Sequence, residues 1–469
     1  MSRSWLIVPL LILYLFDLGG AGFLGPDEPR YASVAREMAL SHDLVTPRLD
    51  GSPWFEKPPL LYWLIAAGKF LRLPDEWVAR LPLALVSIGF LIFFFQILTD
   101  EFSVRRAFAA TAILATSAGW LAYSFVAVTD LPMSATLNAA LLIALFDTRR
   151  DQGYVAGALL GLSILAKSFV PAVLFVPMFL VARGKRLTML AGCVVVAAPW
   201  YVLCGLRNGA VFWRELFWKQ QVERFFTPSL QHVQPFWYYI PILLAGLFPW
   251  TPLAGLLFGR KTYRDVRVLS LAGWVLFGLV FFSAARNKLP GYLLPLLPAL
   301  AIVLASALEA ASSQAKWWLS TSALILGGLP VIMRALPDGL LFGFRKAPFS
   351  FGSPAAILTV LPFVILAAGV WWLAWRDRVT EAILTLGIAI IAAVTYLKIE
   401  TFPILEERVS VRGFWRANQS QAANACLDNV RRDWEYGLNY YAGHAMPACT
   451  DDQMRPRITV KDQRLVVVN

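Results

Sequence analysis

A series of long apolar runs limits what this chain can fold into more than any other feature. An α-helix needs about 20 apolar residues to cross the hydrocarbon layer of a bilayer. Runs 154–166 and 168–182 are shorter, so we expect them to be tilted or to meet at a break near Lys167–Ser168. The pattern predicts an all-α polytopic membrane protein with about 13 transmembrane helices. The runs lie near residues 5–24, 83–99, 107–123, 131–147, 154–166, 168–182, 188–206, 236–258, 268–285, 292–309, 317–335, 355–375 and 380–396.

The composition agrees with a membrane protein. The chain has 469 residues, of which 58% are hydrophobic and 15% charged, with a formal net charge of +12. Its mean hydropathy is +0.60. Soluble domains are less apolar than this. The basic residues are scattered between the apolar runs and form no continuous stripe, so we expect no nucleic-acid partner.

The basic residues fall in alternate short loops, which predicts the orientation of the chain. Short cytoplasmic loops carry an excess of Lys and Arg. We therefore expect a cytoplasmic N-terminus and a first outer loop, residues 25–82, on the extracytoplasmic side together with the C-terminal tail. The residues that set this register are Arg3, Arg105, Arg106, Arg149, Arg150, Arg183, Lys185, Arg186, Arg260, Lys261, Arg264, Arg267, Lys316, Arg376 and Arg378.

The first apolar run also resembles a signal peptide. Arg3 precedes it, and the small residues Gly19–Gly22 follow it. Such a segment is removed from the mature protein. We interpret it as a retained span because the alternation of basic loops begins correctly with this run in place.

Two domains are expected: a transmembrane domain over 1–396 and a small extracytoplasmic domain over 397–469. The tail is charged and ends in an alternating pattern suited to strands, which indicates an α+β domain. Cys426 and Cys449 would lie in an oxidising compartment, where a disulfide is plausible, although two cysteines do not decide it. Cys193 and Cys204 lie in an apolar run and are expected to be packing residues.

The segment Gly25–Trp63 of the first outer loop concentrates charge to an unusual degree. A simple connection between two helices would need few such residues. Asp27 could cap a helix over Tyr31–Leu40, but capping would not explain Glu56 and Lys57 ahead of Pro58-Pro59. The charged residues are Asp27, Glu28, Arg30, Arg36, Glu37, Asp43, Arg48, Asp50, Glu56 and Lys57.

Such a cluster at a membrane surface suits a phosphate-linked substrate. Arg offers a fork of donors to phosphate, and Lys offers a compact charge. A nearby carboxylate can accept a proton from a hydroxyl or amine nucleophile. A lipid-phosphate-linked sugar needs both: its phosphate leaves as an anion that cations stabilise, while its anomeric carbon is attacked from the opposite face. The leaving group is already acidic, so no general acid is required.

The sequences GPDEPRYASVAREM and GSPWFEKPPLLYWL resemble the signature of the lipid A aminoarabinose transferases, glycosyltransferase family 83. More distantly, they are similar to the protein O-mannosyltransferases. Further matches cover the chain to about residue 310: VTDLPMSA, Leu165-Ala166-Lys167, FWRELFWKQQVERFF and Lys288-Leu289-Pro290-Gly291-Tyr292.

The resemblance implies a GT-C-type glycosyltransferase fold in the bacterial inner membrane, with juxtamembrane helices in the first outer loop. It implies that Asp27 is the base or orients the nucleophile, and that acidic residues beside it complete the catalytic set. It also implies cations for the donor phosphate and tyrosines in the substrate cavity. The resulting candidates are catalytic Asp27, Glu28, Glu56 and Asp130; phosphate-binding Arg30, Lys57, Lys167, Arg224 and Lys288; and cavity residues Tyr31 and Tyr62.

Some of these candidates have simpler explanations. Asp130 follows Thr129 and could cap a helix. Arg286, Asn287 and Lys288 could anchor the end of a span among headgroups. Lys167 lies in or near the bilayer, where an unpaired charge is costly, which favours a functional role.

The chain departs from the family where relatives often carry a Glu-His pair, because it has Gln220-Gln221 there. Gln is a poor zinc ligand. The three histidines, His42, His232 and His444, have no paired spacing. We therefore predict that no metal or other cofactor is required.

We predict an inverting glycosyltransferase that moves a sugar from a polyprenyl-phosphate donor to an extracytoplasmic acceptor. The acceptor could be lipid A or another glycolipid, a polysaccharide or a protein. The alternative is a transporter or flippase of lipid-linked sugars. Such proteins place polar residues near the bilayer midplane and often contain repeated halves. The charges here gather at one face and no repeat is visible, which favours the enzyme.

Overall fold

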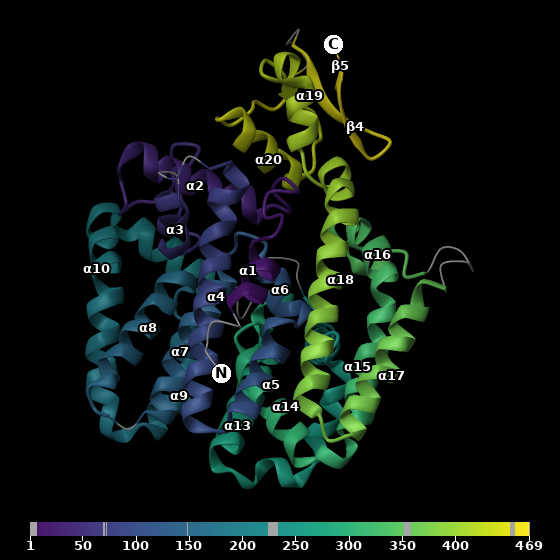
Figure 1. The fold of residues 1–469 in the computed structure, drawn as a ribbon. Helices are drawn as coiled ribbons and strands as arrows, with labels where there is room; N and C mark the ends of the chain where they lie inside the picture. The colour runs from purple at the N-terminus through teal and green to yellow at the C-terminus, as the bar shows by residue number, and fades with distance from the viewer. Residues whose placement is uncertain are drawn as a thin grey trace.

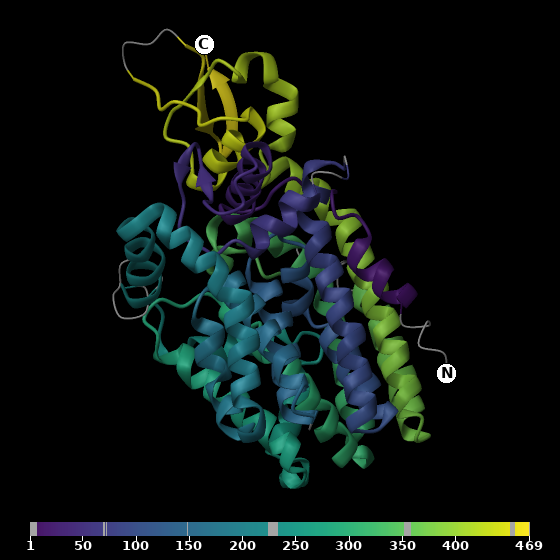
Figure 2. The same ribbon diagram turned by 90° about the vertical axis from the view of Figure 1, so that its left-hand side faces the viewer.

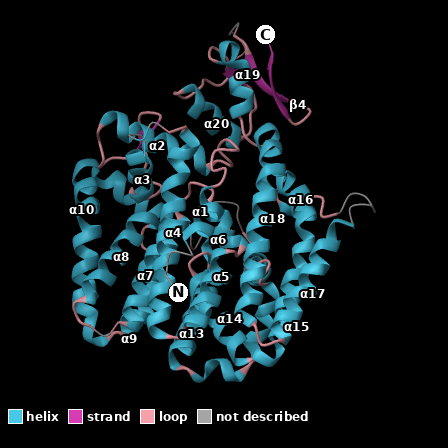
Figure 3. Ribbon diagram, viewed as in Figure 1, coloured by secondary structure: helices cyan, strands magenta, loops and turns pink. Residues whose placement is uncertain are grey.

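The computed structural model describes residues 7–68, 71, 73–147, 149–223, 233–350, 358–450 and 455–468. Long helices lie side by side in a bundle, and the C-terminal domain sits on one end of it (Figure 1). The view from the side shows that α2 and its neighbouring loops lie directly beneath that domain (Figure 2). The larger strands belong to the C-terminal domain (Figure 3). The fold is therefore mainly helical with a small α+β tail, as expected.

The helices of the bundle follow the apolar runs closely. The helices before residue 214 are α1 Ile7–Leu15, α2 Asp27–Ser41, α3 Leu60–Gly68, α4 Asp75–Glu101, α5 Val104–Ala115, α6 Ala118–Ser124, α7 Asp130–Phe146, α8 Gln152–Lys167, α9 Val170–Val181 and α10 Arg186–Trp213. A π-helix, η4, continues α10 over Arg214–Glu223. The later helices are α12 Tyr239–Gly246, α13 Val266–Ala284, α14 Leu296–Ala310, α15 Ala315–Ile325, α16 Leu329–Phe342, α17 Leu361–Trp375 and α18 Val379–Arg408. Short 3-10 helices connect them: η3 Arg183–Lys185, η5 Phe236–Tyr238, η6 Thr251–Phe258, η7 Arg260–Arg264, η8 Pro290–Leu293, η9 Ser312–Gln314, η10 Leu326–Gly328 and η11 Phe344–Lys346.

Within the described residues, six helices are long and apolar enough to cross a membrane, or up to eight if two bent pairs each count as one span. Three shorter apolar helices, α7, α9 and α14, add to these. The expected break near Lys167 is present, since α8 ends at Lys167 and Ser168 has a φ of +61°. The first apolar run is helical only to Leu15, because residues 18–22 form a loop whose carbonyl groups bind Arg80.

Two of the helices break inside the bundle, and the breaks contact each other. The pair α5 and α6 bends by 60°, and the pair η5–α12 and η6 bends by 118°. The amide of Ala118 donates to the Phe248 carbonyl at 2.8 Å, and the Trp250 indole donates to the Thr116 hydroxyl at 2.8 Å. Non-helical backbone at membrane depth persists only where protein groups satisfy it. Each break therefore supplies hydrogen-bond partners for the other.

The C-terminal domain begins later than expected, because α18 continues without interruption past residue 396 to Arg408. The domain consists of α19 Arg412–Ala422, β3 Cys426–Leu427, α20 Arg432–Ala442, β4 Arg457–Lys461 and β5 Arg464–Val468. Strand β4 pairs parallel with β3 and antiparallel with β5. The domain packs around a second apolar core, which includes Trp415, Trp434 and Ile458 and to which Ala21, Leu341 and Leu405 also contribute. Cys426 and Cys449 form a disulfide, which confirms the pairing that the sequence left open.

A buried ion pair between Glu28 of α2 and Arg80 of α4 joins the outer loop to the bundle. Glu28 is 0% exposed and Arg80 is 2% exposed. Arg80 donates to both oxygens of Glu28, at 2.7 and 2.8 Å, and to the carbonyl groups of Leu18, Ala21 and Gly22. The carboxylate also accepts the amides of Leu24 and Ala127 at 2.9 Å. One guanidinium thus fixes the loop before α2 and α2 itself to α4.

We predict that Arg80→Leu strongly destabilises the protein. The substitution leaves the Glu28 carboxylate buried without a cation, which costs about 3–5 kcal/mol in comparable cases. The thermal unfolding midpoint in detergent should fall by many degrees. Arg149→Gln is the control, because its ion pair with Asp147 is exposed and its loss should leave the midpoint unchanged. Equal midpoints for the two variants would show that the buried pair does not hold the loop.

Candidate functional site

The first outer loop folds into two helices joined by a small hairpin. Helix α2 begins at Asp27 directly after Pro26 and ends at Ser41, and the C-cap residue His42 has left-handed backbone dihedrals. Strands β1 Arg48–Leu49 and β2 Ser52–Pro53 pair around Asp50-Gly51, both at positive φ, as a two-residue hairpin turn requires. The Glu37 carboxylate accepts both turn amides, at 2.7 and 3.1 Å. These contacts therefore fix where the segment Trp54–Pro59, between the hairpin and α3, begins.

The folded outer loop brings four predicted residues together at the start of α2. Arg30 forms ion pairs with Asp27, one helical turn earlier, and with Glu56 at 3.1 Å. Lys57 contacts the other oxygen of Glu56 at 3.0 Å. Arg30 and Lys57 are buried, whereas the Asp27 side chain is 48% exposed. Pro26 is the N-cap residue of α2, and Asp27, its first residue, pairs with Arg30.

A second cluster forms where α7 begins and α8 ends. Lys167 at the end of α8 forms an ion pair with Asp130, the first residue of α7. The Lys167 ammonium also lies 4.9 Å from the centre of the Tyr292 ring. Gly291 packs so closely here that a Cβ atom would lie 2.5 Å from the Asp130 carboxylate and 2.6 Å from the Tyr123 hydroxyl. The glycine of the KLPGY motif is therefore required for Asp130 to fit.

A half-open pocket lies between the two clusters. Lys57 reaches it from the first cluster and Lys167 from the second. Its lining is otherwise mostly apolar, with three amide side chains among the lining residues. The other lining residues are Met133, Val170, Gln220, Gln221, Phe281, Phe282, Ala285, Asn287 and Tyr292. The cavity thus presents two ammonium groups, each paired with a carboxylate, to an occupant that is largely apolar.

Aromatic residues surround Arg30. Its guanidinium lies over the rings of Tyr31 and Trp54 at 5.3 and 5.4 Å. Tyr62 packs against Tyr31 with ring centres 5.8 Å apart. Burial raises the pKa of both tyrosines well above its usual value, and the nearby Asp27 and Glu56 carboxylates raise it further. Both hydroxyls therefore remain protonated and can donate hydrogen bonds.

Three buried polar atoms around Arg30 have no hydrogen-bond partner among the described residues. They are Arg30 Nε, the Trp54 indole nitrogen and the Tyr62 hydroxyl. Buried donors in folded proteins are almost always paired. An unpaired group costs about 1–3 kcal/mol, so three of them close together indicate donors that are kept for an oxygen-rich ligand.

Two of the predicted residues lie elsewhere. The Glu28 carboxylate is enclosed by Arg80 and two backbone amides and does not reach the cavity. Lys288 donates to the carbonyl groups of Gln234, at 3.1 Å, and Ala285 and so holds a connecting loop. Its pKa is lowered by burial. Arg224 lies outside the described residues.

The sequence reasoning did not select Trp54, Asn287 or Tyr292 as site residues, although Trp54 and Tyr292 lie in motifs that it quoted. No local signal distinguishes Trp54 or Tyr292 from interfacial aromatics, which are common in membrane proteins. Gln220 and Gln221 were noted only as a departure from the family. The structure places both in the cavity wall.

Comparison of the fold defines the class of protein. The chain superposes on the crystal structure of ArnT from Cupriavidus metallidurans bound to undecaprenyl phosphate with a TM-score of 0.79, covering 97% of this chain and 87% of that chain at 23% identity. The apo form of the same protein gives a TM-score of 0.76. The fold is therefore that of a polytopic GT-C-type membrane glycosyltransferase, as the sequence predicted.

Sequence comparison defines the family. A family model described as dolichyl-phosphate-mannose-protein mannosyltransferase matches residues 56–204. The undecaprenyl phosphate-alpha-4-amino-4-deoxy-L-arabinose arabinosyl transferase of Edwardsiella ictaluri is 30% identical over 397 residues, which cover 78% of this chain and 70% of the relative. The corresponding protein of Serratia proteamaculans is 31% identical over 66% of this chain and 60% of its own length. The chain belongs to this arabinosyl transferase family, and it spans about 60% of the length of several curated relatives.

We predict that Tyr62→Phe leaves the stability unchanged or slightly raised, because the hydroxyl it removes has no protein partner. Tyr14→Phe is the matched control. Tyr14 is equally buried, at 0% exposed, but its hydroxyl donates to the Ala115 carbonyl at 2.7 Å. Thermal unfolding in detergent should show a loss of about 1 kcal/mol for the control only. A comparable loss for Tyr62→Phe would mean that its hydroxyl has a structural partner.

Proposed function

We propose that this protein is an inverting glycosyltransferase that uses a polyprenyl-phosphate-linked sugar as its donor. The observation that carries the proposal is the cavity into which Lys57 and Lys167 both extend, each beside a carboxylate. The names of the relatives specify a donor, undecaprenyl phosphate carrying 4-amino-4-deoxy-L-arabinose, and we propose a donor of this class here.

In this proposal the two ammonium groups hold the donor phosphate and stabilise the negative charge that grows on it as the glycosidic bond breaks. The apolar part of the wall, including Met133 and Phe282, suits the first isoprene units. Asp27, the most exposed carboxylate of the cluster, faces the acceptor and removes or orients its proton. Arg30 pairs with both Asp27 and Glu56 and so fixes the positions of these two carboxylates relative to each other. Attack from the face opposite the phosphate inverts the anomeric centre.

We propose an extracytoplasmic acceptor, namely lipid A or another glycolipid, with a polysaccharide or protein hydroxyl as the further possibilities. If the acceptor is a phosphate, Asp27 orients the nucleophile. If it is an alcohol, Asp27 is the general base.

We propose that the reaction proceeds without a resident metal. Glu56 is neutralised by Arg30 and Lys57. Gln220 and Gln221, which line the cavity, offer only weak amide ligands. In the part of the chain that the structure describes, no group of three or more His, Cys, Asp or Glu side chains could hold a metal ion. The protein's own cations therefore supply the positive charge.

Transfer of labelled sugar from undecaprenyl phosphate in detergent tests the proposal. We predict that Asp27→Asn and Lys57→Ala lower kcat/KM by about 10²–10⁴-fold, the usual contribution of a base or a charge-stabilising group. Asp50→Asn is the control, because Asp50 lies exposed in the hairpin turn and Asn tolerates its positive φ. A chelator should not change the rate.

Unchanged turnover in both site variants would refute the site. Movement of the intact donor across vesicles, without transfer of its sugar, would instead support the transporter or flippase. A chelator-sensitive rate that Zn²⁺ or Mg²⁺ restores would refute the metal-free reaction.

We further propose that α2, α3 and the C-terminal domain face the periplasm. Helix α4 begins beside the outer loop and ends at Glu101. At that far end Arg267 pairs with Glu101 and Asp265, and Arg106 pairs with Glu309. Short cytoplasmic loops carry an excess of such basic residues.

Cysteine labelling tests this orientation. In a background with Cys193 and Cys204 replaced by Ala, we predict that Leu44→Cys reacts with a membrane-impermeant maleimide in intact spheroplasts. Arg260→Cys, which is exposed at the other end, should react only after permeabilisation. The reverse pattern would place the site in the cytoplasm and exclude a periplasmic acceptor.

A further inference from the structure

The C-terminal domain contributes a side chain to the candidate site. Tyr436 of α20 lies with its ring 5.4 Å from the Arg30 guanidinium. Tyr31 and Trp54, which enclose the same guanidinium at 5.3 and 5.4 Å, both come from the first outer loop. The third ring around the Arg30 guanidinium, that of Tyr436, thus comes from the C-terminal domain. The family motifs in the sequence do not extend to this domain.

Helix α20 is attached to α2 one turn beyond Tyr436. Arg36 of α2 donates to the Tyr440 carbonyl at 2.7 Å, and its guanidinium lies 4.5 Å from the Tyr440 ring. Phe23 packs edge-on against the same ring at 4.7 Å. Residues four apart share a helix face, so the contacts of Tyr440 hold Tyr436 toward α2.

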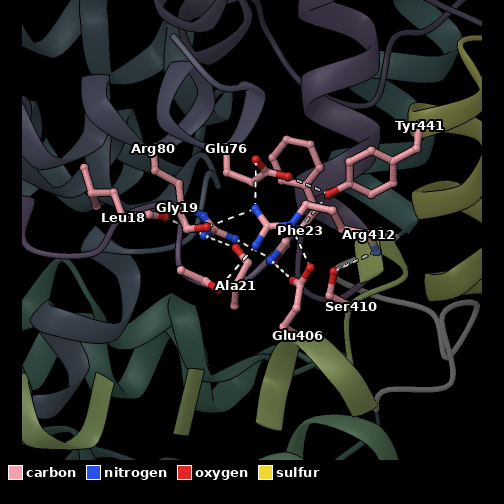
Figure 4. Close-up of polar contacts among 12 residues, drawn as sticks. Leu18, Gly19, Ala21, Phe23, Glu76, Arg80, Glu406, Ser410, Arg412 and Tyr441 are labelled. Atoms are coloured by element: carbon pink, nitrogen blue, oxygen red, sulfur yellow. Dashed lines mark hydrogen bonds and ion pairs between the residues drawn. The ribbon is translucent and has the colours of Figure 1, made fainter. Parts of the chain in front are cut away.

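A network of ion pairs holds the rest of the domain against the loop before α2 (Figure 4). Arg412 of α19 pairs with Glu76 of α4 at 3.1 Å and with Glu406 of α18 at 2.8 Å. The Tyr441 hydroxyl donates to Glu76 at 2.7 Å, and Glu406 accepts the Gly22 amide at 2.6 Å. The Cys426–Cys449 disulfide closes the loop that carries α20. The position of Tyr436 is therefore fixed from several directions.

We propose that Tyr436 is a positioning residue of the transferase and that the C-terminal domain completes the active site through it. The inference rests on the proposed function. Arg30 carries a long side chain and holds both Asp27 and Glu56, so any rotation of its guanidinium moves the two carboxylates. Three rings lie over this guanidinium, and that of Tyr436 adds to those of Tyr31 and Trp54. The donor phosphate is held in this proposal by Lys57 and Lys167, whose ion pairs are with Glu56 and Asp130.

The test is the kinetics of Tyr436→Leu in the transfer assay. We expect kcat to fall about three- to thirty-fold, the range that a cation–π contact of this kind accounts for. The KM for the donor should change by less than about twofold, because a group that acts only in the transition state leaves ground-state binding intact. Tyr436→Phe keeps the ring and should retain the wild-type kcat. Phe414→Leu, which truncates a partly buried ring packed against the domain's apolar core, is the control for general loosening.

A double variant separates positioning from folding. If Tyr436 acts through Arg30, adding Tyr436→Leu to Arg30→Lys should lower kcat no further. Additive losses, or an equal loss in Phe414→Leu, would overturn the inference in favour of a purely structural role. A wild-type kcat in Tyr436→Leu would overturn it as well while leaving the transferase intact. A wild-type chain without transfer activity would overturn the proposed function and this inference with it.

Discussion

The ion pair between Glu28 and Arg80 is the interaction on which the arrangement of the outer loop depends. Isolated charges are too costly to bury, so each must be compensated where it lies. Arg80 meets this requirement with one carboxylate and three carbonyl groups, and Glu28 meets it with Arg80 and two amides. Because these partners come from α2, α4, the loop after α1 and the loop before α7, the pair joins four separate segments. Arg30, only two residues from Glu28, takes its position from this anchored helix.

The membrane imposes a second constraint that shapes the site. Backbone groups in the hydrocarbon must be satisfied by protein, so helices can break only where a partner is available. The breaks near Thr116 and Phe248 satisfy each other. The break at Ser168 ends α8 at Lys167 and allows the ammonium to reach Asp130. The same interruptions that would weaken a simple span therefore create the polar end of the cavity.

The site itself is assembled from three regions of the chain. The outer loop supplies Asp27, Arg30, Glu56 and Lys57, the bundle supplies Asp130 and Lys167, and the C-terminal domain supplies Tyr436. Most of these residues are positioned by helix ends or ion pairs rather than by mobile connections. Catalytic groups must be held within a fraction of an ångström, so this dependence on packed elements is expected.

The sequence by itself determined that the chain crosses a membrane repeatedly, because apolar runs of that length have no other stable environment. It also predicted a candidate site in the outer loop, since charge is rare in this chain and its concentration there is unusual. The sequence could not show that the adjacent residues Asp27 and Glu28 have different partners. Successive residues of a helix point about 100° apart, so these neighbours meet different partners. Asp27 finds Arg30 within its own helix, whereas Glu28 finds Arg80 on another. Similarly, no feature of the sequence around Lys288 shows that backbone carbonyls bind its ammonium group. Nor does the sequence around Tyr436 show that its ring lies against Arg30. Those assignments depend on contacts between distant segments, which only the tertiary structure decides.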